Sequence, residues 1–235
     1  MASHGAEPHG AGLSARLNWL RAGVLGANDG IVSVAGIVIG VAGATSSVTA
    51  IATAGVAGLV AGAMSMAGGE YVSVSTQRDT ERAVLAKERW ELENMPDDEL
   101  AELTGLYEAK GLSPELAGQV ASQLTAHDAL RAHAEVELGI DPDDLTSPWA
   151  AAGASFLAFT IGALLPLLAI LVPVDGTRVW LCVAAVLLGL TITGWLSARL
   201  GGADAGRAIM RNVLMGAATM AFTWAVGRIF GYAVS

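Results

Sequence analysis

Four long stretches of this chain contain no Asp, Glu, Lys or Arg, and they limit the folds that it can adopt. The stretches cover residues 30–69, 145–174, 179–198 and 212–227. A helix that crosses a lipid bilayer needs roughly 20 mostly apolar residues. The first stretch is about twice that length, and small polar residues at 43–47 predict a tight turn in its middle. We therefore expect five membrane spans, near residues 21–43, 48–72, 149–172, 178–199 and 208–232.

The composition excludes several classes of protein. Hydrophobic residues make up 53% of the 235 residues and charged residues only 15%, whereas soluble domains carry about 25% charged residues. The single cysteine, Cys182, excludes a disulfide framework and a cysteine-based zinc site. A net charge of −9 argues against nucleic acid as a partner. The chain has no nucleophile elbow, phosphate loop or dinucleotide-binding glycine pattern, so we do not expect an enzyme.

An acidic segment separates the second and third spans. Residues 70–144 hold 18 acidic and 6 basic side chains. Residues 71–94 contain no Pro or Gly and predict that the second span continues through them as a helix. Further helix signals follow, with starts at Pro96, at Ser113 and at Thr125 with Asp128, and a stop at Gly139, and no strand pattern occurs.

These patterns predict an all-α membrane protein with five transmembrane helices and a helical cytoplasmic metal-binding domain inserted between helices two and three. The expected parts are a polar N-terminal tail at 1–20, transmembrane helices at 21–75, the acidic domain at 76–146 and transmembrane helices at 147–235.

The basic residues predict the orientation of the spans, because Lys and Arg concentrate on the cytoplasmic side. Most of them fall on one side of the membrane if the N-terminus is cytoplasmic. This orientation places the acidic segment in the cytoplasm and the C-terminus outside. The first 18 residues lack the apolar centre of a signal peptide. Because no organelle-targeting signal is evident and the composition is Ala- and Gly-rich, as in many bacterial chains, we expect the plasma membrane.

Two glycine pairs have the spacing that permits close helix contact. They are Gly36 with Gly40 and Gly58 with Gly62. Such a contact can lie within one chain or between two copies of it, and the sequence leaves both possibilities open.

Asp29 is an ionisable residue within the first span. It follows Arg21 by eight residues, which is about 12 Å along a helix. A carboxyl group at that depth is costly in lipid and typically marks an ion path or a proton relay. The alternative is a helix that begins only at Gly30, with Asp29 in its cap.

Met66 and Glu70 lie four residues apart at the end of the second span and therefore share one helix face. The second span runs antiparallel to the first, so Met66 is expected at a depth similar to that of Asp29. A carboxylate beside a thioether suits a borderline-soft divalent cation. We predict that Asp29, Met66 and Glu70 form a translocation path, although a methionine alone would more simply be a packing residue.

Metal-ligand residues recur at helical spacing in the acidic segment. Such spacing puts two side chains on one helix face, and helices that meet can enclose an ion between those faces. A solvated surface is the alternative for any single glutamate. The candidate metal ligands are Glu88, Glu91, Glu99, Glu102, His133 and Glu137.

Taken together, four motifs resemble the vacuolar iron transporter family of Fe²⁺/Mn²⁺ exporters, in a bacterial-type form. The motifs are Asn28-Asp29-Gly30-Ile31-Val32, residues 62–71 around Met66, residues 91–96, and Glu137-Leu138-Gly139. The resemblance implies a homodimer with a pore between its subunits that exchanges divalent metal for protons. It also implies that Asp29 and Met66 line the pore. The cytoplasmic metal-binding glutamates that it implies are Glu88, Glu91, Glu99, Glu102 and Glu137.

Two positions depart from the family pattern. Eukaryotic-type members have a pore glutamate where this chain has Gly58, and Glu70 is our candidate replacement. The same members have two methionines where this chain has His133-Ala134. Because imidazole also binds iron, we expect metal binding to survive this change.

We therefore expect a transporter that exports Fe²⁺ and/or Mn²⁺ from the cytoplasm by proton antiport. The metal ions are its substrates and bound ions, and no prosthetic group is expected. The expected partners are divalent metal ions, protons, the lipid bilayer and a second copy of the chain. The alternative is a membrane-anchored metal sensor or store without transport, which would need no ionisable residue deep among its spans.

Overall fold

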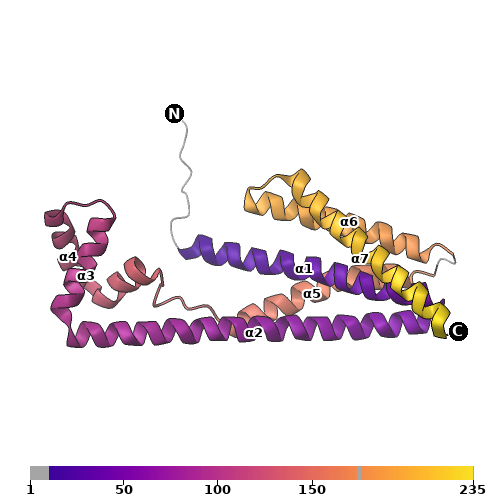
Figure 1. Ribbon diagram of the computed structural model, residues 1–235, viewed down its shortest axis with the longest axis horizontal. Coiled ribbons are helices and arrows are strands. Elements are labelled where there is room, and N and C mark those ends of the chain that lie inside the picture. Colours follow the sequence, from indigo (N-terminus) through magenta and orange to yellow (C-terminus); the bar gives the residue numbers. More distant parts are fainter. Residues whose placement is uncertain (1–10, 174–175, 235) are drawn as a thin grey trace. The chain divides into compact units, whose positions relative to one another are not determined.

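The computed structural model describes residues 11–173 and 176–234 (Figure 1). Within these ranges every regular element is helical and no strand occurs. The helices are α1 (Ala11–Ala44), α2 (Val48–Asn94), α3 (Pro96–Ala109), α4 (Pro114–His133), the π-helix η1 (Ala134–Leu138), α5 (Pro148–Leu171), α6 (Arg178–Gly201) and α7 (Ala205–Val234).

Five of these helices are long and apolar enough to cross a membrane, as the uncharged stretches predict. They are α1, α2, α5, α6 and α7, and their bounds lie within a few residues of the predicted spans, apart from two extensions. The first is the predicted continuation of the second span, because α2 runs without a break to Asn94. The second is a correction: α1 begins at Ala11, so residues 11–20 are helical although we expected a polar tail.

The chain divides into two compact units, and each is described by itself. The first, here the membrane unit, comprises Met1–Tyr71 and Trp149–Ser235, and the second, here the acidic unit, comprises Val72–Pro148. Helix α2 contributes residues to both units.

The membrane unit is held together by glycines that let helix backbones approach closely. A Cβ atom added at Gly162 of α5 would lie 2.0 Å from the carbonyl oxygen of Ala27 in α1. One added at Gly227 of α7 would lie 1.8 Å from the carbonyl oxygen of Gly40 in α1. No side chain fits in either place, so these crossings require glycine. The buried faces of α1, α5 and α6 form the core around Val34, Phe159 and Val186.

The glycine pair Gly36 and Gly40 makes its contact within the chain. A Cβ atom at Gly36 would lie 3.3 Å from the Thr219 side chain, and one at Gly40 would lie 3.2 Å from the Thr223 carbonyl oxygen. Both partners belong to α7. Of the two possibilities that the sequence leaves open, the structure therefore favours packing inside one chain for this pair.

In the acidic unit, α3 and α4 form a hairpin over a small core of Leu103, Ala121 and Ala132. The predicted starts at Pro96 and Ser113 and the stop at Gly139 are confirmed, whereas Thr125 lies inside α4 and the predicted third start falls at Asp128 instead. The Ser113 side chain accepts a hydrogen bond from the Leu116 N–H at the start of α4. Asp128 interrupts α4 with extended backbone angles, and its carboxylate accepts the Arg131 N–H at 3.0 Å, as an N-cap does. Gly139 ends η1 with a φ of 65°.

Candidate functional site

Three helices of the acidic unit bring two carboxylates and an imidazole together. Glu88 of α2, Glu99 of α3 and His133 of α4 each offer a ligand atom, and these atoms lie within 4.8 Å of one another. Nδ1 of His133 lies 2.9 Å from Oε1 of Glu88 and 3.5 Å from Oε2 of Glu99. All three residues are buried, with at most 5% of their surface exposed. We call this set the acid–histidine cluster.

Helix termini help to place this cluster. Met95 is the only residue between α2 and α3, so the chain turns sharply and carries Glu99 back toward Glu88. Glu99 lies in the first turn of α3 and His133 in the last turn of α4. The positive end of the α3 dipole thus faces a carboxylate.

The polar atoms of the cluster lack ordinary partners. Oε1 of Glu88 and both ring nitrogens of His133 are buried without a hydrogen bond of acceptable geometry. A buried polar atom left in this state costs free energy. A cation held between the carboxylate oxygens and an imidazole nitrogen would remove that cost, and this mixed ligand set suits Mn²⁺ and Fe²⁺.

Burial and mutual repulsion favour the protonated carboxyls in the absence of a cation. Burial, followed by the charges of Glu137 and Glu99, raises the pKa of Glu88 to about 7. Burial and the charge of Glu102 raise the pKa of Glu99. A divalent cation would reverse this balance because it favours the ionised forms.

The remaining predicted ligands lie around the cluster. Oε2 of Glu137 lies 3.7 Å from His133 Nδ1, and its side chain is 29% exposed. Glu91 forms an ion pair with Lys87 at 2.7 Å, and Glu102 is exposed. Glu91 and Glu102 are absent from the tight group but close enough for their charges to raise the pKa of Glu88. Their role as ligands stays a prediction.

The π-helix at this site is a feature that the sequence reasoning missed. Residues 134–138, directly after His133, form i→i+5 hydrogen bonds, and this widened turn includes Glu137. Such turns are frequent at functional sites. The pattern of the sequence carries no signal for it, because the spacing of His133 and Glu137 equally fits an α-helix.

A second candidate site is a groove in the membrane unit that gathers the three residues predicted for the translocation path. Asp29 of α1 and Met66 and Glu70 of α2 line one cavity of about 620 Å³. Each of the three is partly buried. We call this cavity the Asp29 groove. Its other lining residues are Ser33, Ile37, Gly58, Ala61, Gly62, Ser65, Gly69 and Phe159.

The alternative interpretation of Asp29 as a helix cap is wrong. Helix α1 runs continuously from Ala11 to Ala44, so Asp29 lies well inside it. The Ser33 hydroxyl donates a hydrogen bond of 2.9 Å to Oδ1 of Asp29. The neighbouring Asn28 is used differently, because its side-chain oxygen accepts a hydrogen bond from Thr193 of α6. Of these two adjacent polar side chains, Asn28 therefore makes a packing contact with α6 and Asp29 lines the groove.

Gly58, which departs from the family pattern, also lines the Asp29 groove. A Cβ atom there would meet only the flexible end of the Ile37 side chain, at 2.4 Å. Gly62 is more constrained, because a Cβ atom would lie 2.2 Å from the Phe159 ring. Ser33 and Phe159 are groove residues that the sequence reasoning missed. Ser33 follows Asp29 by four residues on one face of α1, a spacing that could have found it, whereas only the packing of α5 brings Phe159 to this place.

The fold and the two sites define a multi-pass helical membrane protein with carboxylate-rich sites suited to cations. Comparison with known proteins then identifies the family. The chain belongs to the VIT family, whose model matches residues 20–228. The resemblance expected from the motifs is thereby confirmed.

Several relatives are similar along most of their length. A vacuolar iron transporter of Acanthamoeba castellanii is 46% identical over 210 residues, which cover 89% of this chain and 77% of that protein. Vacuolar iron transporter homolog 1 of Oryza sativa subsp. japonica is 39% identical over 94% of this chain and 78% of that protein. Vacuolar iron transporter homolog 1 of Arabidopsis thaliana is 36% identical over 93% of this chain and 86% of that protein.

Proposed function

We propose that this protein is a membrane transporter that moves Fe²⁺ and/or Mn²⁺ out of the cytoplasm in exchange for protons. The observation that carries the proposal is the Asp29 groove, in which Asp29, Met66 and Glu70 line one cavity of the membrane unit. A sensor or store would need no carboxyl group there, so the groove favours transport over that alternative. The names of the relatives support iron as the cargo.

In this proposal Asp29 couples the two fluxes. Its carboxylate binds a divalent cation when ionised and releases the cation when it takes up a proton. The hydrogen bond from Ser33 fixes one carboxylate oxygen and leaves the other for the ion. Met66 supplies a soft sulfur ligand, which disfavours Mg²⁺ and Ca²⁺ relative to Fe²⁺ and Mn²⁺. Glu70 supplies the second acid of the groove.

The acid–histidine cluster collects metal on the cytoplasmic side. Glu88, Glu99 and His133 are its ligands, Glu137 completes the ligand set, and Glu91 and Glu102 attract cations to it. Loading of this kind matters most at low metal concentration, where capture of the ion limits the flux.

We also propose that the transporter is a homodimer. Helix α2 exposes Val56, Val60 and Met64, and Ile37 of α1 is also partly exposed beside the Asp29 groove. A two-fold interface over these residues would close the groove with a second copy of itself. The proposed orientation has a cytoplasmic N-terminus and an external C-terminus.

The plasma membrane is the proposed location, on the composition argument given above, whereas the names of the relatives specify a vacuole. Fractionation of the membranes of the source cell, followed by detection of the protein with an antibody, tests this part of the proposal.

The transport proposal is tested with purified full-length protein in liposomes. Fe²⁺ or Mn²⁺ added outside should enter vesicles that hold a metal-sensitive dye, and a pH dye should report proton movement in the opposite direction. A sensor or store would bind metal in the same preparation and produce no flux, and that result would reject the proposal.

A further inference from the structure

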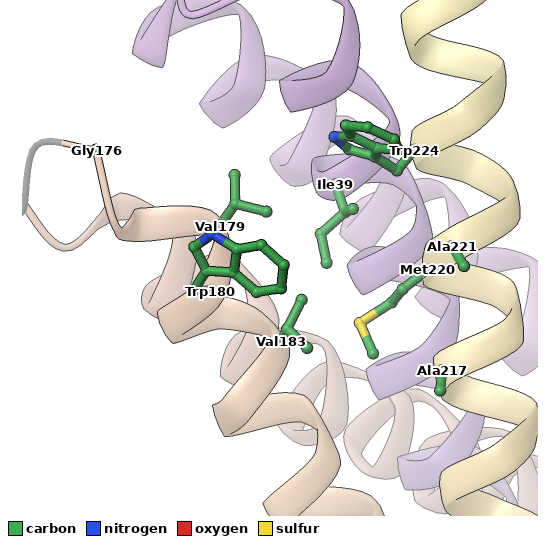
Figure 2. Close-up of a pocket in the computed structure, with 9 residues that line it drawn as sticks. All are labelled: Ile39, Gly176, Val179, Trp180, Val183, Ala217, Met220, Ala221 and Trp224. Atoms are coloured by element: carbon green, nitrogen blue, oxygen red, sulfur yellow. The ribbon is translucent and has the colours of Figure 1, made fainter.

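A second cavity of the membrane unit has no acidic residue in its lining and has a different chemistry from the two sites above. It has a volume of about 500 Å³ and is lined by nine residues of α1, α6, α7 and the turn before α6. Figure 2 shows these residues around a gap between α6 on one side and α1 with α7 on the other. The lining residues are Ile39, Gly176, Val179, Trp180, Val183, Ala217, Met220, Ala221 and Trp224.

The cavity exists because α7 changes its close partner along its length. Near its start α7 packs on α6, where a Cβ atom at Gly194 would lie 2.9 Å from the Ile209 backbone. Near its end α7 packs on α1, where Gly227 approaches the Gly40 carbonyl oxygen. The end of α7 therefore diverges from the start of α6. The small side chains of Ala217 and Ala221 do not fill the space between these two helices.

The cavity and Arg228 together extend over about the depth of one leaflet of a bilayer. The α7 residues that line the cavity end at Trp224, and Arg228 lies about one helical turn beyond them. From Ala217 to Arg228 α7 rises by about 16 Å, at 1.5 Å per residue. This is close to half of the hydrocarbon thickness of about 30 Å. Trp180 and Trp224 lie toward the end of the cavity that is nearest the helix termini, and they are 73% and 45% exposed. Exposed tryptophans of this kind mark the level of the lipid headgroups.

A cation lies beside this tryptophan level. The Arg228 guanidinium stacks on the Trp224 ring at 5.7 Å and on the Tyr232 ring at 4.8 Å. No carboxylate among residues 11–173 and 176–234 forms an ion pair with it. One guanidinium nitrogen donates a hydrogen bond to the Tyr232 hydroxyl, and the remaining N–H donors are suited to bind a phosphate group.

We propose that this cavity holds one acyl chain of an anionic phospholipid whose phosphate group binds Arg228. The apolar lining accepts part of the chain, the distance from Ala217 to Arg228 matches one leaflet, and the arginine at the tryptophan level selects the negative headgroup. The lipid would act as a fixed wedge between α6 and the α1–α7 pair. This site is independent of the Asp29 groove, so neither proposal depends on the other.

Native mass spectrometry of the full-length protein tests this proposal. The protein is taken from vesicles of equal amounts of phosphatidylglycerol and phosphatidylcholine into mild detergent, and the retained lipids are counted. We expect one phosphatidylglycerol per chain. Arg228→Gln should lower the preference for phosphatidylglycerol by about fivefold, the usual worth of one basic residue at a membrane surface. Ala217→Leu puts a larger side chain where the acyl chain would lie and should lower the amount of bound lipid.

Matched variants control for general effects. Arg211→Gln removes an exposed arginine near the other end of α7, and Ala218→Leu enlarges the exposed neighbour of Ala217. Both should retain the lipid. Ala221→Leu fills the same cavity from another position and replaces Ala217→Leu if that variant does not fold. Retention of the lipid by the filled variants, or no preference for phosphatidylglycerol in the unmodified protein, would overturn the proposal. A third outcome would also overturn the proposal. If the unmodified protein retains no lipid and the Ala217→Leu variant converts a dimer into monomers, the cavity instead binds a second copy of the chain.

Discussion

At the scale of single residues, the buried carboxyl of Glu88 would link the proposed metal binding to pH. Burial raises its pKa from 4.5 to about 7, so near neutral pH a metal ion must displace a proton from it. The raised pKa has a consequence for stability as well. Between about pH 4.5 and pH 7 the unfolded chain loses this proton and the folded chain keeps it. The free energy of unfolding therefore falls as pH rises through that window, because the folded chain must then hold an ionised Glu88 in a buried place. Bound metal would restore this stability.

We predict that the apparent metal affinity of the acid–histidine cluster is highest above pH 7 and falls about tenfold for each pH unit below it, as expected for one displaced proton. Titration calorimetry of the full-length protein with Mn²⁺ at several pH values measures this slope. Glu88→Gln cannot ionise and should weaken binding and flatten the slope. Glu108→Gln, a change at an exposed glutamate of α3, is the control and should leave both unchanged. An affinity that does not change between pH 6 and 8 would contradict the prediction.

Single residues also mark the limit of sequence reasoning. The pairs Glu88–Glu91 and Glu99–Glu102 have equivalent spacing, yet Glu88 and Glu99 are buried beside His133 whereas Glu91 pairs with Lys87. Spacing places two side chains on one helix face but does not say which member of a pair points at a neighbouring helix. That choice depends on the turn at Met95 and on the rotation of α3 and α4 around their small core.

At the scale of the helices, the five spans and most of their ends could be predicted because they depend on local properties, although the start of α1 at Ala11 could not. Uncharged stretches, the cap at Asp128 and the stop at Gly139 all act within a few residues. The Phe159 contribution to the Asp29 groove and the partner of Gly36 could not be predicted, because each depends on which helix packs against which.

Helix packing gives a prediction with a matched pair of glycines in α5. Gly162→Ala would place a Cβ atom 2.0 Å from the Ala27 carbonyl oxygen, whereas the Cβ atom of Gly153→Ala would meet nothing within 4 Å. We expect Gly162→Ala to lower the free energy of unfolding by about 1–3 kcal/mol, because α1 and α5 must move apart. Gly153→Ala should be neutral or stabilising, since alanine favours the helix. Thermal unfolding in one detergent compares the two, and equal stabilities would show that the crossing of α1 and α5 is not as close as described.

At the scale of the whole molecule, the proposed homodimer predicts which cysteines cross-link. Ile37→Cys and Met64→Cys, each in a Cys182→Ala background, should form disulfide-linked dimers in membranes. Leu188→Cys on α6 should not, although Leu188 is 63% exposed. The reason is that Ile37 lies on the Asp29 groove, which a second copy would close, whereas α6 would face lipid. Cross-linking only at residue 188, or a monomer by mass in mild detergent, would exclude the proposed interface.

The central claim is that metal and protons share Asp29, and one measurement tests it most directly. Metal and proton fluxes are recorded together in liposomes for the unmodified protein and for Asp29→Asn, which keeps the size of the side chain but cannot ionise. Asn28→Asp,Asp29→Asn, which moves the acid by one position, is the control for the charge of the helix. We predict that both variants remain folded and bind Mn²⁺ at the acid–histidine cluster, yet lose both fluxes. Transport of metal and protons at the normal rate by Asp29→Asn would contradict the account.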